Sequence, residues 1–515
     1  MINRTTAVFL ILGALAAIAG AVFAHFMALP FGAGVSPVSV DYLAARDSLL
    51  AGEGFKDHLG QELVRWPPLF PMLLAGIAQT GSDAIDVVPV LNGIMHGAVA
   101  VLTAYAVLRS TGSRLLTLSV GALVATGPPL VFSAYFVWPE PAFTLLFVVT
   151  VWVTLVHIEQ PTATRLVGLT LLCAMAVMLR YAGLAILAGA VVSILLFASS
   201  PLHRRLRDST IVAAGAGLPL MLWLLRNLAN SETAYGEHGT SVRPFAATVS
   251  DVSRQASSWF LPETLIGQVS VAVVAIILLV TALIAVRSGI LAQTRERWRP
   301  LAVVGLFLAG YGAFVTLSMY TFSACCADRY LGPVYPLAIV LVAGSAGVVI
   351  WHVKGSPVRR VGMLIAAILF AGWGAMNITR SVGIIETLRD RGAGYNSAFW
   401  RDNRTIAWLE SGDLAANACI VTNAPETLYF RLGFPCLSPA PRVALYNGVP
   451  VTLDERPAFA DRIGAAEKPV LLVWINGMRT TEHHPVDALR RYVELELVHR
   501  DDDGAVYIVS AKGGT

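Results

Sequence analysis

The stretch RWPPLFPMLLAG, from Arg65 to Gly76, lies in a 515-residue chain of which 56% is hydrophobic. Pro67 and Pro68 favour extended backbone at the residues before them, so a helix cannot run through this point. A helix can begin after Pro68, but the apolar run is too short to cross a bilayer, which takes roughly 20 residues. The stretch therefore predicts a turn of the chain followed by a helix in the membrane surface, with Trp66 at headgroup level.

The rest of the chain has the composition of a membrane protein. Only 14% of the residues are charged and the mean hydropathy is +0.66, which is far more apolar than a soluble globular protein. The sequence predicts a polytopic α-helical membrane protein with about 11 transmembrane helices. The predicted spans are 6–28, 87–108, 115–134, 141–158, 166–180, 182–199, 209–226, 265–286, 301–322, 334–351 and 361–379.

Positive charge predicts the orientation of these spans, because cytoplasmic connections are enriched in Lys and Arg. With the N-terminus in the cytoplasm, every connection on that side is basic, carrying Arg4, Arg109, Arg114, Arg165, Arg204, Arg205, Arg207, Arg287, Arg295, Arg297, Arg299, Lys354, Arg359 and Arg360. An odd number of spans then places the C-terminus outside the cytoplasmic (inner) membrane. The net charge of +4 comes from these loops and does not indicate nucleic-acid binding.

The residues after the last span are polar and form a separate unit in the prediction. Short β-like runs at 418–422, 470–475 and 505–509 alternate with helical patterns near 403–410, 425–432 and 486–493. Such alternation predicts a small extracytoplasmic α/β domain. We divide the chain into a transmembrane domain, 1–380, with a structured first outer loop at 29–86, and a soluble domain, 381–515. Cys419 and Cys436 fall in the latter, and the sequence leaves open whether they form a disulfide.

Several motifs together resemble one family of membrane enzymes. An acidic residue, Asp41, follows the first span, and a helical stretch ending in LLAGEG at 49–54 precedes PPLFPMLLA at 67–75. Further matching pieces are LRYAGLAIL at 179–187, LWLLRNLANSETAYGEHG at 222–239, DRYLGPVYPLAIV at 328–340 and VTNAPETLYFRLG at 421–433. In this order they resemble the GT-C glycosyltransferases, in the bacterial phospholipid-carrier-dependent branch that includes proteins like protein O-mannosyltransferases and aminoarabinose transferases.

This resemblance implies transfer of a sugar from a polyprenyl-phosphate-linked donor to an acceptor at the outer membrane face, with inversion. The acceptor hydroxyl then needs a general base, and the leaving lipid phosphate needs cations. Asp41 is the candidate base, and Glu140 looks like the second acid that family members carry between the third and fourth spans. Arg180, Arg226 and Arg329 lie at outer ends of spans and are candidates for phosphate binding, because guanidinium binds phosphate bidentately.

Tyr42 and Tyr330, adjacent to Asp41 and Arg329, complete the predicted set of binding residues. Each assignment has a simpler alternative. An acid just before helical spacing, as at Asp41, can be a helix N-cap, and Arg329 can form an ion pair with its neighbour Asp328. Tyr42, like Trp66, Tyr135 and Trp138, can anchor the chain at the membrane interface instead of stacking against a sugar.

The same positions bear on metal binding. Family members often carry two adjacent acids after the first span, whereas Tyr42 follows Asp41 here. We therefore assign no metal ligand, and whether a divalent metal takes part stays open.

A membrane transporter or lipid flippase is the alternative function. Transporters place ionisable residues near the bilayer midplane, often in two repeated halves, whereas the charges here gather at the outer face and no repeat is present. The predicted partners are the lipid-linked donor, membrane lipids and an acceptor that is a protein, a lipid or a glycan. The sequence selects neither this acceptor nor the sugar.

Overall fold

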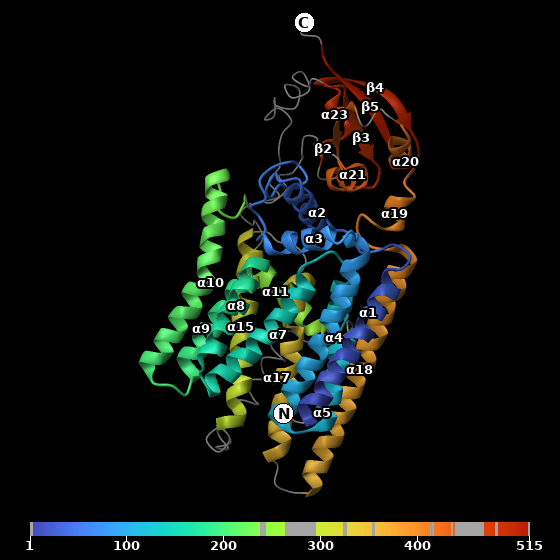
Figure 1. Ribbon diagram of the computed structural model, residues 1–515. Coiled ribbons are helices and arrows are strands. Elements are labelled where there is room, and N and C mark those ends of the chain that lie inside the picture. The colour runs from blue at the N-terminus through green and yellow to red at the C-terminus, as the bar shows by residue number, and fades with distance from the viewer. Residues whose placement is uncertain are drawn as a thin grey trace.

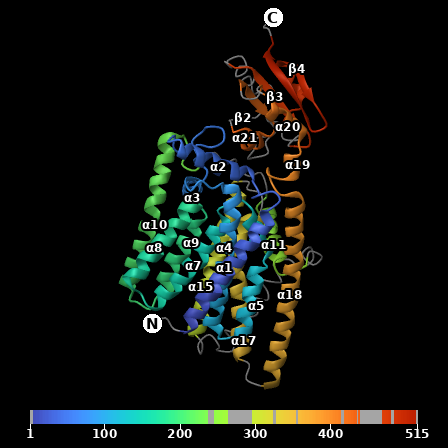
Figure 2. The same ribbon diagram turned by 45° about the vertical axis from the view of Figure 1, so that its right-hand side comes forward.

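The computed structural model describes residues 4–236, 244–262, 295–322, 327–352, 356–412, 414, 417–433, 436–437, 468–478 and 483–512. Figure 1 shows a bundle of long helices with a small sheet-containing domain above one end. We call this end of the bundle the domain end. Two short helices of the first long loop lie between the bundle and the domain, and the turned view in Figure 2 shows the same order.

The bundle is that of a polytopic membrane protein. Seven of the described helices are long and apolar enough to cross a bilayer: α1 (Arg4–Ala28), α4 (Ala84–Thr111), α7 (Glu140–Glu159), α10 (Leu202–Asn230), α15 (Arg295–Phe322), α17 (Tyr335–His352) and α18 (Ser356–Arg391). An eighth span results if α5 (Arg114–Ala125) and α6 (Pro128–Tyr135), which meet at a bend of 41°, count as one. The shorter apolar helices are α8 (Ala163–Leu179) and α9 (Gly183–Phe197).

These helices coincide with ten of the eleven predicted spans, taking α5 and α6 as one. The remaining predicted span, 265–286, lies outside the described residues. Two of the ten, α8 and α9, are shorter than a typical span, and Arg180 lies in the break between them.

Helices α1 and α4 pack backbone to backbone. A Cβ atom built at Gly93 would lie 2.2 Å from the carbonyl oxygen of Gly20, and one built at Gly97 would lie 2.2 Å from that of Ala16. Small residues allow this close approach, which is how helices in lipid gain packing energy.

The first long loop contains α2 (Pro37–Leu50) and α3 (Leu69–Gln79). Helix α3 begins directly after Pro68, as the proline-rich stretch predicts, and buries Phe70 and Leu74 while exposing Met72 and Leu73. The N-cap of α2 is Ser36, whose hydroxyl accepts a hydrogen bond from the Ser39 N–H at 3.3 Å. Asp41 therefore lies inside the helix, and the N-cap alternative for it is wrong.

The C-terminal domain contains a mixed sheet with helices around it, which confirms the predicted α/β character. The strands are β1 (Cys419–Thr422), β2 (Cys436–Leu437), β3 (Val470–Ile475), β4 (Val493–Arg500) and β5 (Gly504–Ala511), in the order β2-β1-β3-β5-β4. β1 runs parallel to β2 and β3, whereas β5 is antiparallel to β3 and β4. The helices are α19 (Ala398–Arg401), α20 (Arg404–Ser411), α21 (Pro425–Leu432) and α23 (Val486–Leu489).

Three details of this domain bear on the predictions. The helical pattern expected over 486–493 ends early, because α23 stops at Leu489 and β4 begins at Val493. The Cys419 thiol is free. Helix α18 continues to Arg391, beyond the expected boundary, so the division at residues 380 and 381 stays a prediction.

Candidate functional site

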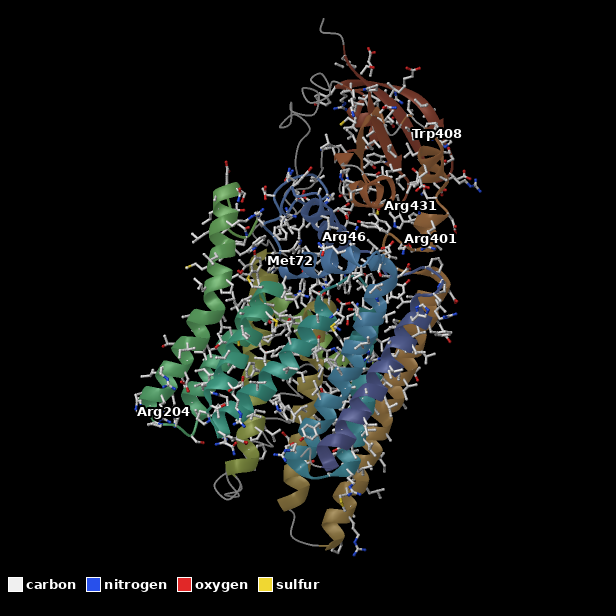
Figure 3. All side chains as sticks on the ribbon, viewed as in Figure 1. Arg46, Met72, Arg204, Arg401, Trp408 and Arg431 are labelled. Atoms are coloured by element: carbon white, nitrogen blue, oxygen red, sulfur yellow. The ribbon has the colours of Figure 1, made fainter. Side chains whose placement is uncertain are left out.

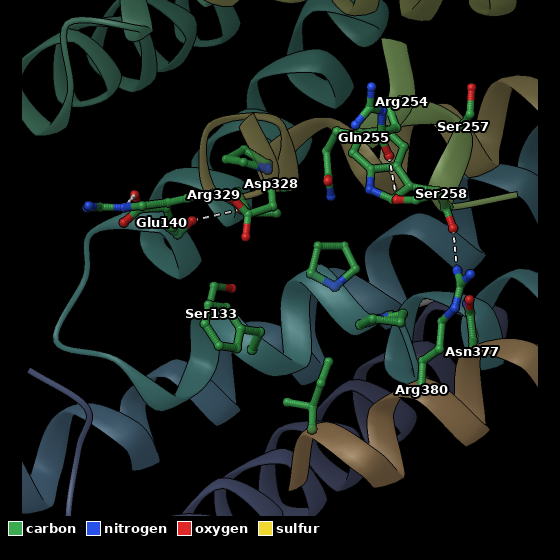
Figure 4. A pocket seen from close by; sticks show the side chains of 18 of the residues that line it. Ser133, Glu140, Arg254, Gln255, Ser257, Ser258, Asp328, Arg329, Asn377 and Arg380 are labelled. Carbon is green, nitrogen blue, oxygen red and sulfur yellow. Dashed lines mark hydrogen bonds and ion pairs between the residues drawn. The ribbon is translucent and has the colours of Figure 1, made fainter. Parts of the chain in front are cut away.

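A cavity of about 1270 Å³ lies among helices of the bundle. Its walls come from α6, α7 and α18, and from α11 (Phe245–Ser258), α16 (Ala327–Leu331) and the 3₁₀ turn η1 (Gly332–Val334). The charged residues that line it are Glu140, Arg254, Asp328, Arg329 and Arg380. Figure 4 shows Glu140 and Arg329 on one side and Arg254, Gln255 and Arg380 on the other. Apolar side chains and the hydroxyl groups of several serines fill the wall between the charges.

Glu140 is the centre of a buried charge cluster. Pro139 precedes it, and Glu140 is the first residue of α7, where the positive end of the helix dipole stabilises a carboxylate. Its side chain is 2% exposed, and its Oε1 forms ion pairs with the guanidinium groups of both Arg180 and Arg329. Its Oε2 has no hydrogen-bond partner among the described residues. Two buried cations against one carboxylate leave an excess of positive charge, which an anion would complement.

Aromatic rings hold the two guanidinium groups in place. Arg329 lies over the Trp138 ring at 4.2 Å, and Arg180 lies over the Tyr330 ring at 5.3 Å. These distances suit cation–π attraction. Trp138 also donates a hydrogen bond from Nε1 to the Ser36 hydroxyl at 2.8 Å, so the start of α2 is tied to the cluster.

Tyr42, on α2, faces the same cluster. Burial raises the pKa of its phenol well above the ordinary value, while the nearby charges of Arg180 and Arg329 act in the opposite direction. The structure thus brings five predicted site residues together: Tyr42, Glu140, Arg180, Arg329 and Tyr330.

The alternatives for Arg329 and the aromatic residues are settled by the same contacts. Arg329 pairs with Glu140, not with its neighbour Asp328. Tyr42, Tyr135 and Trp138 are 2%, 0% and 6% exposed, so they pack inside the protein and the prediction of interfacial anchors is wrong for them.

Asp41 belongs to a second cluster. Its Oδ1 is hydrogen-bonded to Nδ1 of His58 at 2.7 Å, and the two side chains are 17% and 12% exposed. Asp57 lies nearby, and burial together with the charge of Asp41 raises the pKa of its carboxyl. Asp41 is not among the described residues that line the cavity, although its chain neighbour Tyr42 faces the Glu140 cluster.

Arg226 lies apart from both clusters. Its guanidinium pairs with Glu62 of the first long loop and covers the Trp223 ring at 4.9 Å. In this position it fastens the loop to α10. The Tyr181 hydroxyl, from the break between α8 and α9, donates to the Val64 carbonyl of the same loop at 3.0 Å.

Sequence reasoning missed His58 and the α11 wall of the cavity. Helix α11 is polar, and its Arg254 and serines can be recognised as cavity residues only in the structure, where they line the same cavity as residues of α7 and α18. Arg380 of α18 donates to the carbonyl oxygens of Ser258 and Leu261, which holds the end of α11 in place. An amphipathic segment between two spans was the available signal. The described residues contain no group of three or more His, Cys, Asp and Glu side chains arranged to hold a metal ion.

No family model matches the sequence, and neither does any curated protein. Solved structures match the fold. ArnT from Cupriavidus metallidurans in the apo state is similar over 96% of this chain and 97% of its own, with a TM-score of 0.59 and 14% identity. ArnT bound to undecaprenyl phosphate gives 0.58 with the same coverage and identity.

The arabinofuranosyltransferase AftD from Mycobacteria is similar over 97% of this chain and 41% of its own, with a TM-score of 0.51 and 15% identity. At such identities the likeness concerns the fold. The chain therefore has the fold of the GT-C glycosyltransferases, in its ArnT-like form.

Proposed function

We propose that the chain is a membrane glycosyltransferase that moves a sugar from a polyprenyl-phosphate-linked donor to an acceptor, with inversion. The observation that carries this proposal is the buried cluster of Glu140, Arg180 and Arg329 on the wall of a large cavity within a GT-C fold. The ArnT structure with undecaprenyl phosphate supports a donor of this class, because the two proteins share the fold along nearly their whole lengths.

The arginines are assigned to the donor phosphate. Arg329 lines the cavity, and Arg180 supports it from behind, through the shared Glu140 oxygen. As the bond between the sugar and the phosphate breaks, negative charge grows on the leaving phosphate, and prearranged guanidinium groups stabilise it. Glu140 is assigned to holding the two cations side by side. Tyr330 and Tyr42 lie beside the two guanidinium groups. The ion pair of Arg226 with Glu62 suits a role in fastening the first long loop.

Asp41 is assigned as the general base. In an inverting transfer the acceptor hydroxyl attacks the anomeric carbon from the side opposite to the phosphate, so the base must lie away from the cations. The separation of Asp41 from Arg180 and Arg329 supports this assignment, because Asp41 pairs with His58 while its chain neighbour Tyr42 faces the two arginines. It takes the hydroxyl proton as the new glycosidic bond forms and the lipid phosphate departs.

The domain end is assigned to the outer face of the cytoplasmic membrane, with the N-terminus in the cytoplasm. Figure 3 supports this orientation: Arg204, in a basic connection, lies at the far end of the bundle from Arg401 and Arg431 of the C-terminal region. Cytoplasmic loops are the ones enriched in positive charge.

The test is a transfer assay in lipid nanodiscs with radiolabelled undecaprenyl-phosphate sugars and an extract of envelope lipids and glycans as acceptor. Asp41→Asn should stay folded and lose transfer. Asp47→Asn is the matched control, because Asp47 lies on the same helix, paired with Arg46 and half exposed. Full transfer by Asp41→Asn would overturn the base assignment. Movement of the donor across the bilayer of vesicles that contain the protein, without release of undecaprenyl phosphate, would favour the transporter alternative.

A further inference from the structure

The C-terminal domain contacts the first long loop beside Asp41. Helix α21 of that domain lies against α2 of the loop, as both ribbon views show. At this contact the ring of Tyr429 meets the imidazole of His58 edge to face, with the ring centres 6.1 Å apart. His58 is thus held between the first long loop and the C-terminal domain.

Charged groups surround His58 from both sides. Asp41 and Asp57 come from the loop and Glu426 from α21, while Arg46 and Asp47 of α2 face Tyr429. Burial opposes protonation of the imidazole, but the hydrogen bond to Asp41 and the three carboxylate charges outweigh it, so the pKa of His58 is raised. A protonated imidazole at this point offsets carboxylates that would otherwise repel one another.

We propose that His58 is a positioning residue that fixes the carboxylate of Asp41, and that Tyr429 and Glu426 of the C-terminal domain keep His58 in place. The inference rests on the proposed function, in which Asp41 is the base. Because Nδ1 of His58 engages Oδ1 of Asp41, Oδ2 is the oxygen that takes the acceptor proton. The C-terminal domain then completes the active site through a side chain that touches no substrate.

The first test compares pH profiles of kcat in the transfer assay. In the wild type, kcat should fall as the pH rises through the raised pKa of His58, because the imidazolium that holds Asp41 is lost. His58→Gln keeps a hydrogen-bond donor but does not titrate, so this pH step should disappear. His58→Leu should lower kcat by about 10- to 150-fold, the usual range for a hydrogen bond to a charged group, with little change in the donor KM.

A matched control is His499→Gln, because Nε2 of His499 is bonded to Asp501 at 2.7 Å, the same length as the His58–Asp41 bond, but within the C-terminal domain. Its profile should match the wild type. Tyr429→Ala should lower kcat without raising the donor KM. Tyr429→Phe, which keeps the ring against His58, should have the kcat of the wild type. An active wild type whose pH step survives in His58→Gln would overturn the inference and leave the proposed function intact.

A second measurement does not depend on turnover. In ¹³C-histidine NMR spectra of the full chain in nanodiscs, the His58 resonance should titrate at lower pH in Asp41→Asn than in the wild type, and its pKa should also change in Tyr429→Ala. Identical titration in all three proteins would refute the positioning role, whatever the enzyme does. A wild type that transfers no sugar while these shifts are present would refute the proposed function, and the link from Tyr429 through His58 to Asp41 would stand.

Discussion

Replacement of Arg329 by alanine probes the donor site with little risk to the fold. Among the described residues, Arg329 is the partner of Glu140 that lines the cavity, whereas Arg180 packs behind it against Phe143 and Tyr330. The variant removes the cation that lines the cavity but leaves the buried carboxylate of Glu140 paired with Arg180. We therefore expect a folded protein with a weakened phosphate site.

The expected loss of affinity follows from the contact removed. A hydrogen bond between charged groups contributes about 1.5–3 kcal/mol, which corresponds to roughly 10- to 150-fold in Kd. The loss of folding free energy should be smaller than the about 3–5 kcal/mol that follows when a buried charge loses its partner, since Glu140 keeps Arg180. Loss of the cation–π attraction between Arg329 and the Trp138 ring lowers the free energy of unfolding by about 0.5–2 kcal/mol more.

The assay is native mass spectrometry of undecaprenyl phosphate binding, with thermal unfolding measured in parallel. Arg226→Ala is the matched control, because Arg226 also pairs with a carboxylate and covers a tryptophan ring, but belongs to neither charge cluster. We expect its Kd to stay within about twofold of the wild type, an effect of less than about 0.5 kcal/mol. Equal weakening by both variants, or by neither, would refute the assignment of Arg329 to the phosphate.

Three further predictions concern stability. Glu140→Gln leaves two buried guanidinium groups without a countercharge, so unfolding free energy should drop by about 3–5 kcal/mol; an unchanged thermal midpoint would contradict the cluster. Gly93→Val places a side chain against the backbone of α1 and should abolish monodisperse protein in size-exclusion chromatography, whereas Gly76→Val, with no neighbouring atom within 4 Å, should elute normally. The pKa of His58 is raised in the folded protein, so its contribution to docking of α21 is complete below the ordinary value of about 6.5 and is lost as the pH rises through the folded value. Hydrogen exchange of α21 amides, corrected for intrinsic rates, should speed up over that range in the wild type and not in His58→Gln.

The helices could be predicted because lipid imposes a length and a composition on every span. The break at Arg180 is informative: the two predicted spans around it end and begin within a few residues of α8 and α9. Pro68 likewise fixed the start of α3. The N-cap alternative for Asp41 was wrong because α2 begins earlier, at Pro37 after the N-cap Ser36. An acid before a helical pattern is a stronger signal in the sequence than the two serines of this capping box.

The charge partners could not be predicted, because they are far apart in the chain. Glu140 meets Arg329 across 189 positions, and Arg226 meets Glu62 across 164. The sequence places Arg180, Arg226 and Arg329 at the same membrane level. It could not show that Arg226 pairs with Glu62 of the first long loop. For His58, the partner on α21 lies in another domain, so nothing local distinguished it from a polar loop residue.

The most direct measurement is a cryo-EM map of the wild-type protein in nanodiscs with undecaprenyl phosphate added. We expect phosphate density inside the cavity within hydrogen-bonding distance of Arg329, on the side of Glu140, with the isoprenoid chain extending toward the bilayer. A phosphate bound elsewhere, with the cavity beside Arg329 filled by protein or water alone, would contradict it.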